Sequence, residues 1–234
     1  MLQNTLVKHQ LSFNMPSIDD LFGGFAEGDF AVFYGTPTIL DLSLLLAVRA
    51  QLPFQLGGLE TNVVFVDGGN SFRLYQVSRI AQLHQLDPRK VLERIYISRA
   101  FTAYQMTSLI LERLNESIRL RSKLVIISDI AGLYLDKDVP SREAKEIFSQ
   151  LTLHLSRFSQ ENGLIVIATC LPHYDSRLGS FFRAVACGRA NVALSVKPSK
   201  FGQRLFLEKH PSLRLGCAEF SSENLTLEQF MESD

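Results

Sequence analysis

The chain has 234 residues, 46% of them hydrophobic and 21% charged, a length and composition that fit one soluble globular domain. Its 24 Lys and Arg residues balance 24 Asp and Glu residues, and this zero net charge argues against nucleic-acid binding through a positive field over the whole surface. No apolar run approaches the roughly 20 residues of a membrane-spanning helix. No metal site is expected, since Cys170, Cys187 and Cys217 are widely spaced and form no C-x-x-C pair.

The chain is expected to begin with a short N-terminal arm, residues 1–13, before a turn segment rich in glycine and aspartate. The first strand is then predicted at 30–34, and a leucine-rich helix at about 38–51. Thr38 is expected to cap this helix, with Asp41 three residues later completing a start that resembles a capping box.

The connection between this strand and this helix has the position of a phosphate-binding loop without its residues. Such a loop requires G-x-x-x-x-G-K-[ST], in which the glycines turn backbone amides inward, the lysine contacts the phosphates and the hydroxyl binds magnesium. Here Gly35 is followed by Thr36-Pro37-Thr38, with no second glycine and no lysine before the end of the helix. The sequence therefore predicts a nucleotide-binding fold that has lost its nucleotide site.

The rest of the chain alternates between apolar strands and amphipathic helices. Strands are predicted at 62–66, 95–98, 123–129, 164–169, 192–197 and 203–209. Helices are predicted from about Leu74, after Asp87-Pro88, at 103–121 and at 141–161, whereas 170–191 is predicted to be irregular. This order indicates one α/β domain over residues 14–221, with a mainly parallel central sheet flanked by helices and antiparallel strands at one edge. Residues 222–234 carry only acidic charges and are predicted to be a C-terminal tail.

Several segments, in order, resemble the RecA-like core of the RadA-type recombinases of archaea and eukaryotes. SIDDLFGGFAEGDFAVFYG resembles that family's entry into the ATP-binding strand, and VVFVDGGNSFR its strand ending in D-T-E-x-T-F-R. The segments ERIYISRAF, KLVIISDIAGLY, LIVIATCLP and LFLEKHPSLRLGCAEF are similar to later parts of the same core. The likeness covers residues 12–221 and implies the fold of a RecA-like P-loop NTPase.

The resemblance assigns four positions to a vestigial nucleotide site. Gly35 stands at the first glycine of the phosphate loop, and Asp129 falls where the family's aspartate holds magnesium through water. Gly69 takes the place of the glutamate that positions the attacking water, and Leu171 that of the glutamine that senses the γ-phosphate. An alternative for Asp129 is a carboxylate at a strand end that caps the next turn. These losses imply a chain without ATPase activity, without catalytic residues and without a nucleotide cofactor.

Residues 170–191 correspond to the family's loop that contacts single-stranded DNA. Arginines for phosphates and aromatic rings for bases are the features of a single-strand binder. The candidates are Tyr174, Arg177, Phe181, Phe182, Arg183 and Arg189. The alternative is that Phe181 and Phe182 dock this segment on the core while the arginines are solvated. FFRA also fits the F-x-x-A pattern by which recombinase subunits grip one another.

Two functions of different classes are compatible with these observations. The first is a non-catalytic recombinase paralogue, an accessory module in DNA recombination and repair that pairs with a recombinase or another paralogue and binds single-stranded DNA. The second is a KaiC-like regulatory or structural protein that forms a homo-oligomer without binding DNA or ATP. Both are expected away from membranes and inside the cell, in the cytoplasm of a prokaryote or the nucleus of a eukaryote.

Overall fold

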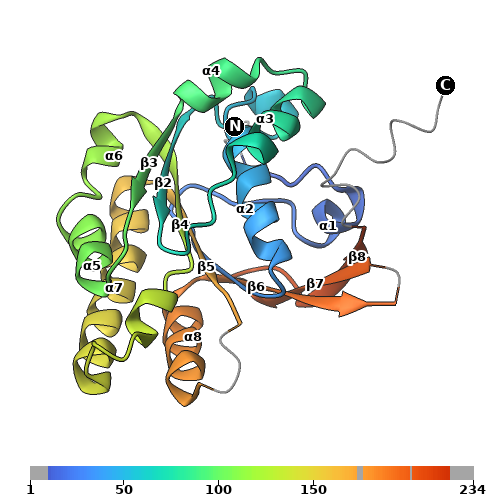
Figure 1. The fold of residues 1–234 in the computed structure, drawn as a ribbon. Helices are drawn as coiled ribbons and strands as arrows, with labels where there is room; N and C mark the ends of the chain where they lie inside the picture. The colour runs from blue at the N-terminus through green and yellow to red at the C-terminus, as the bar shows by residue number, and fades with distance from the viewer. Residues whose placement is uncertain (1–9, 173–175, 201, 222–234) are drawn as a thin grey trace, which may run out of the picture.

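The computed structural model describes residues 10–172, 176–200 and 202–221. In these residues eight strands form one sheet in the order β3-β2-β4-β5-β1-β6-β7-β8 (Figure 1). The strands are β1 (Phe30–Gly35), β2 (Asn62–Asp67), β3 (Ile95–Arg99), β4 (Ser122–Ser128), β5 (Ile165–Cys170), β6 (Val192–Ser199), β7 (Gly202–Lys209) and β8 (Gly216–Phe220). All pairings from β3 to β6 are parallel, and β6-β7 and β7-β8 are antiparallel. The predicted fold class is confirmed.

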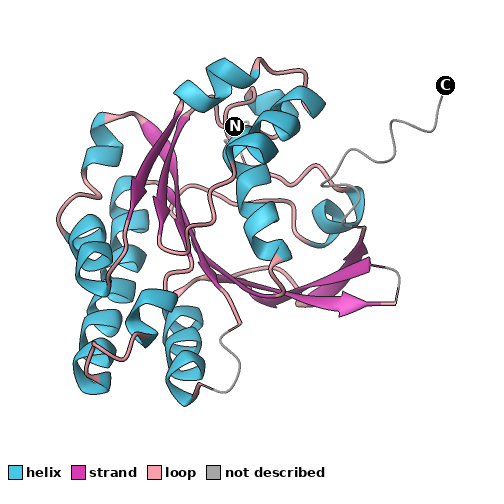
Figure 2. Ribbon diagram, viewed as in Figure 1, coloured by secondary structure: helices cyan, strands magenta, loops and turns pink. Residues whose placement is uncertain are grey.

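Helices cover both faces of the parallel part of the sheet (Figure 2). The helices are α1 (Pro16–Leu21), α2 (Thr38–Arg49), α3 (Leu74–Leu83), α4 (Pro88–Glu93), α5 (Ala103–Leu111), α6 (Glu116–Arg119), α7 (Ser141–Asn162) and α8 (Arg177–Arg189), with short 3₁₀ turns η1 (Phe54–Leu56) and η2 (Gly132–Leu135). Buried residues of α2, α3 and α4 belong to one apolar cluster, and those of α5, α7 and α8 to the cluster on the opposite face. Within the described ranges, none of the helices combines the length and apolar character that a bilayer crossing demands.

The central strand β1 shows why these apolar runs form buried strands. Successive side chains point to opposite faces, so Phe30 and Val32 enter one cluster while Ala31 and Phe33 enter the other. All four residues are at most 1% exposed. Full burial of a large apolar side chain contributes about 1.5–3 kcal/mol, so a strand apolar on both faces is stabilised only between two helical layers.

The start of α2 differs from the predicted capping arrangement. Thr38 is the first helical residue rather than the cap, and no side-chain hydrogen bond caps the helix at Pro37. Asp41 instead accepts a hydrogen bond from Gln76 at 2.8 Å and forms an ion pair with Arg73 at 3.8 Å. The prediction was wrong because these long-range partners, 32 and 35 residues away in sequence, bind the carboxylate that the local pattern assigned to the helix start.

The segment predicted as one helix over 103–121 is interrupted. α5 ends at Leu111, and α6 begins only at Glu116. Leu114, in the intervening turn, is 3% exposed, whereas Ile118, four residues later in α6, is 46% exposed. The apolar face of α5 therefore does not continue through α6, and tertiary packing overrides the helical pattern.

The segment predicted to be irregular contains a regular helix, α8. Ser176 caps it by accepting a hydrogen bond from the amide of Gly179 at 2.9 Å. Phe182 and Ala186, four residues apart, are both fully buried on its inner face. Gly179 and Gly188 weaken helix propensity and conceal this pattern in the sequence.

The described end of the expected N-terminal arm lies in the core. Leu11 pairs with Phe25 in an isolated β-bridge and is fully buried, and Phe13 is only 1% exposed. Arg49 at the end of α2 is 1% exposed and donates Nε to the carbonyl of Ser12 at 2.6 Å and Nη2 to the carbonyl of Leu56 at 2.7 Å. Residues 1–9 and the predicted acidic tail at 222–234 lie outside the described residues.

Candidate functional site

The four positions that the resemblance assigns to a nucleotide site lie at one end of the sheet, where its parallel strands end. Gly35 ends β1, and Gly69, Asp129 and Leu171 follow β2, β4 and β5 within two residues. The carboxyl ends of parallel strands are where open α/β sheets bind their ligands. The structure therefore brings together the positions that the resemblance selected, and the surrounding contacts decide what this edge can hold.

The connection from β1 to α2 is closed off by the neighbouring strand β6. Only Thr36 and Pro37 separate the two elements. The amide of Thr36 donates to the carbonyl of Val196 at 3.0 Å, and its hydroxyl donates to Oε1 of Gln203 at 3.1 Å. Gly35 has φ +117°, and a Cβ there would overlap the Val196 carbonyl. Glycine at this position serves the close approach of β6, and the Thr36 amide does not point to an open phosphate cradle.

The first turn of α2 carries a carboxylate where a phosphate-binding helix presents free amides. Asp41 is held there by Gln76 and Arg73. A helix N-terminus attracts anions, and Asp41 already supplies the negative charge. Ser43, the nearest following hydroxyl, is 1% exposed and donates to the carbonyl of Leu40 at 2.7 Å, so it is turned into the helix.

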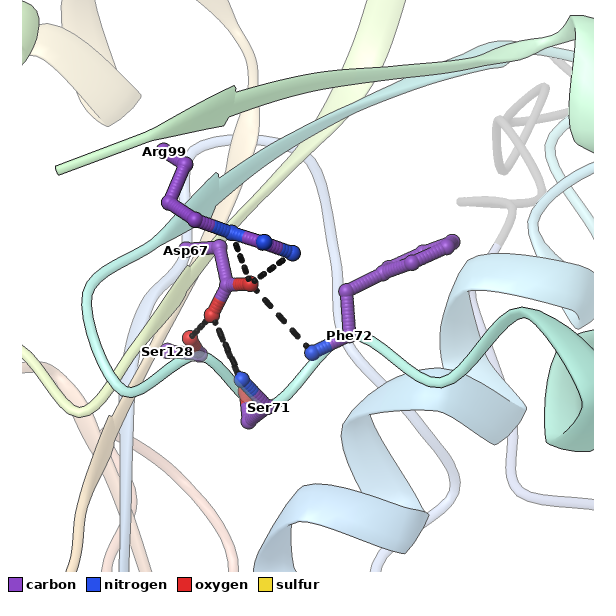
Figure 3. Close-up of polar contacts among 5 residues, drawn as sticks. All are labelled: Asp67, Ser71, Phe72, Arg99 and Ser128. Carbon is purple, nitrogen blue, oxygen red and sulfur yellow. Dashed lines mark hydrogen bonds and ion pairs between the residues drawn. The ribbon is translucent and has the colours of Figure 1, made fainter.

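A buried carboxylate, Asp67, fixes the loop that follows β2 (Figure 3). It is 0% exposed and accepts hydrogen bonds from the amide of Ser71 at 2.8 Å, the amide of Phe72 at 3.4 Å and the hydroxyl of Ser128 at 2.9 Å. Arg99 adds Nε at 3.1 Å and an ion pair through Nη2 at 3.1 Å. This cluster was not predicted from the sequence, although an aspartate at the end of an apolar strand before Gly-Gly is its signal.

The Asp67 cluster ties three neighbouring strands together at their ends. Its members come from β2, from β3 and from the last residue of β4. Since a buried carboxylate is stable only with its hydrogen bonds complete, the loop over residues 68–73 has little freedom to reorganise.

Asp129 lies in a backbone enclosure, with φ +45° and 5% exposure. Its amide donates to the hydroxyl of Thr169 at 2.8 Å, and its Oδ1 accepts from the amide of Leu171 at 3.3 Å. A Cβ at Gly132 would overlap its carboxylate, and a Cβ at Gly69 would lie 3.0 Å from its Cβ. These contacts are those of a strand-end carboxylate that caps the chain segments next to it.

Leu171 and Gly69 offer this edge no polar side chain. Leu171 is half-buried and packs against the cluster of α2, α3 and α4. No group of three or more His, Cys, Asp or Glu side chains that could hold a metal occurs in the part of the chain that the structure describes. Cys170, at the end of β5, is buried, and this burial raises the pKa of its thiol well above the ordinary value.

The candidate DNA-binding residues divide into a buried and an exposed set. Phe182 is fully buried, with its ring centroid 4.5 Å from that of Phe148 and 6.2 Å from that of Tyr134. Its assignment to base stacking was wrong because α8 needs an apolar anchor to dock on the sheet. Tyr174 lies outside the described residues.

The exposed face of α8 carries the other candidates. Arg177, Arg183 and Arg189 are exposed, and Phe181 is 37% exposed. The Nζ of Lys145 lies 5.2 Å from the centre of the Phe181 ring. The guanidinium carbon of Arg183 lies 5.5 Å from the centre of the Tyr34 ring, a cation–π contact.

Positive charge continues from α8 into the strands that follow it. The segment 176–215 contains eight Lys and Arg residues and one acid, Glu208. Lys209 donates to the carbonyls of Cys187 at 3.2 Å and Gly188 at 3.0 Å, so a cation also covers the C-terminal end of α8. Because the net charge of the whole chain is zero, Asp and Glu outnumber Lys and Arg in the rest of the chain by the same number. The charge distribution is therefore strongly asymmetric.

Comparisons with known proteins agree with this fold and with the resemblance seen in the sequence. The family model described as Rad51 matches residues 10–183. The DNA repair protein Rad51 homolog of Drosophila melanogaster is 30% identical over 166 residues, which make up 68% of this chain and 49% of that protein. The meiotic recombination protein DMC1 of Saccharomyces cerevisiae is 26% identical over 197 residues, 82% of this chain and 55% of that protein.

The chain spans about half the length of these curated relatives. The family model nevertheless covers well over half of the chain, from the bridge at Leu11 through most of α8. The sheet order, with parallel strands around β1 and an antiparallel edge, is consistent with a RecA-like core. The chain belongs to the Rad51 family.

Proposed function

We propose that this chain is a non-catalytic paralogue of the Rad51 family that acts as an accessory protein in DNA recombination and repair. Its similarity to a DNA repair protein and to a meiotic recombination protein supports a role in this process. The observation that carries the non-catalytic part is the two-residue connection between β1 and α2, whose Thr36 amide is bound to Val196.

Loss of nucleotide binding follows from the contacts that this connection lacks. The missing lysine would supply a charge-assisted hydrogen bond worth about 1.5–3 kcal/mol. The Thr36 amide is hydrogen-bonded to Val196, and Asp41 places a negative charge in the first turn of α2. Electrostatic repulsion of a triphosphate therefore replaces the attraction of a phosphate loop.

Loss of hydrolysis is supported at two further places along the chain. Gly69 has no side chain to orient or deprotonate water, and Leu171 cannot hydrogen-bond a phosphate oxygen. Restoring one group would leave the others absent, because phosphoryl transfer depends on the phosphate clamp, the metal and the positioned water together.

We assign single-stranded DNA binding to the exposed face of α8. Arg177, Arg183 and Arg189 would contact phosphates, and Phe181 would stack on one base. The excess of positive charge over residues 176–215 supports an interface that continues beyond the helix.

The test of the catalytic part is calorimetry with ATP and magnesium, combined with a phosphate-release assay. We expect no binding heat at micromolar concentrations and no turnover above buffer. A micromolar Kd, with turnover that disappears in Asp129→Ala, would overturn the proposal. The accessory role is tested by direct binding to the recombinase of the same organism, and failure to bind it or any repair protein would count against that role.

A second candidate is a KaiC-like regulatory or structural protein that self-associates without DNA. Exposed apolar side chains around the edge strand β3 favour it, since Tyr96 is 40%, Ile97 44% and Phe101 70% exposed. Light scattering across a concentration series, together with anisotropy of a labelled oligothymidine, separates the two. A homo-oligomer without DNA affinity supports this second function.

A further inference from the structure

A hollow of about 240 Å³ opens between the end of β3 and helix α5, beside the Asp67 cluster, and none of its lining residues belongs to α8 or to the four positions that the resemblance assigns to a nucleotide site. It is lined by Arg99, Gln105, Ser108, Leu109 and Arg113. Four of these five side chains are polar, and two are guanidinium groups. The hollow therefore differs in character from the apolar clusters below it.

Arg99, the first arginine of the hollow, is held in place by a buried carboxylate. Asp67, which is 0% exposed, binds Nε and Nη2 of Arg99, each at 3.1 Å. The Arg99 side chain is still 38% exposed, so part of the same guanidinium reaches the hollow. This geometry orients a cation before any partner arrives, which lowers the entropy cost of binding.

The neighbouring side chains present donors to the same space. Oε1 of Gln105 accepts from the amide of Phe101 at 2.8 Å, which leaves its NH₂ group as the outward end. Arg113 lies two residues after the end of α5, and in the described part of the chain its guanidinium has no hydrogen bond or ion pair. Two guanidinium groups and an amide NH₂ around one hollow suit an oxyanion.

The surroundings favour a single carboxylate over a polyanion. The negative charge of Asp67 offsets the positive charge of Arg99. Glu112, which accepts a hydrogen bond from the Ser108 hydroxyl at 2.6 Å, is next to Arg113 in the sequence. The local charge is thus near neutral, and a nucleic-acid strand would lack the cumulative attraction on which its binding depends.

The apolar neighbours of the hollow point to a protein partner. Tyr96, which lies on the α5 face of β3 beside Leu109 and Arg113, is 40% exposed, and Phe101 is 70% exposed. Within the described sheet β3 pairs with β2 alone. A protein segment can cover such apolar side chains while one of its acidic residues enters the hollow. Arginine together with aromatic and aliphatic residues is also typical of the centre of a protein–protein interface.

We propose that the hollow between β3 and α5 receives a carboxylate side chain of the protein partner, with Arg99 and Arg113 as its two cationic ligands. The partner is the recombinase of the proposed accessory function, so this inference rests on that function and names the chemistry of its contact. Arg113 is the residue to vary, because Arg99 also completes the buried Asp67 cluster.

The experiment measures the affinity of the full chain for the recombinase of the same organism by biolayer interferometry. Arg113→Glu is compared with Arg157→Glu, which reverses an exposed arginine near the C-terminal end of α7 that does not line the hollow. We expect Kd to rise at least tenfold in Arg113→Glu, to stay within twofold of wild type in Arg157→Glu, and to change less than threefold in Arg113→Lys. Thermal melting of all three variants checks that each is folded.

Hydrogen exchange of the wild-type complex adds an independent readout, with slowed exchange expected over 95–113 when the recombinase binds. Equal affinities of wild type and Arg113→Glu would overturn this inference and leave the accessory function standing. No binding by the wild type would overturn both. If Arg113→Glu instead weakens only a labelled oligothymidine, the hollow serves nucleic acid and the inference fails.

Discussion

The backbone amide of Thr36 donates a hydrogen bond to the carbonyl of Val196, 3.0 Å away on β6. This contact decides the character of the β1–α2 connection, because it turns the loop toward the sheet and away from the edge where a phosphate would lie. Val196 also crowds Gly35, so a glycine that the family pattern assigns to phosphate binding has a packing role here.

Gly35→Ala is expected to destabilise the fold strongly. The residue has φ +117°, and an added Cβ would overlap the Val196 carbonyl. Strain at positive φ costs about 1–2 kcal/mol and overpacking about 1–3 kcal/mol more. Urea unfolding measures the sum. Gly188→Ala is the matched control, because a Cβ there meets nothing within 4 Å and the added helix propensity stabilises by about 0.5–1 kcal/mol. Equal stability of the two variants would contradict the packing role.

Asp67→Ala is expected to lose about 2–4 kcal/mol of unfolding free energy. It removes the acceptor of two amides and two hydroxyls and leaves the Arg99 charge without its buried partner. Glu93→Ala, at an exposed acid, should stay within about 0.5 kcal/mol of wild type. A loss below 1 kcal/mol in Asp67→Ala would mean that the loop after β2 is held by other contacts.

The two adjacent phenylalanines of α8 should separate stability from DNA affinity. Phe182→Ala is expected to cost about 3–5 kcal/mol, because its ring is buried against Phe148 and Tyr134. Phe181→Ala should leave stability nearly unchanged and weaken oligothymidine binding by about 1–3 kcal/mol, the value of one stacked base. Unchanged DNA affinity in Phe181→Ala would remove base stacking from the proposed interface.

Arg183→Glu tests the electrostatic part of the same interface. Anisotropy of a labelled oligothymidine, measured from low to moderate salt, should give weaker binding and a salt slope reduced by about one unit relative to wild type. Arg157→Glu changes the net charge equally and lies near the C-terminal end of α7, shortly before β5 begins and outside the proposed interface, so it should keep the wild-type slope. The same loss in both variants would indicate a net-charge effect without a local site.

The sheet was predictable from the sequence because its strands are apolar on both faces, as Phe30 and Phe33 show by entering opposite clusters. α8 was not, since its helical pattern depends on Phe182 and Ala186 while Gly179 and Gly188 argue against a helix. The site was predictable as a set of positions at strand ends. Its contacts were not, because Thr36 meets Val196 and Asp67 meets Ser128 only through the spatial order of strands, which no local pattern encodes.

His84, at the end of α3, should make stability depend on pH. Burial, and then the charge of Arg49, lower its pKa from 6.5 to about 4 in the folded chain. The unfolded state therefore binds the proton more readily, so this stabilisation is fully present above about pH 6.5 and is lost as the pH falls toward 4. Thermal melting from pH 7 to pH 4.5 should show a smaller decrease of Tm in His84→Gln than in wild type. Parallel curves for the two proteins would show that the charge on His84 does not control this decrease.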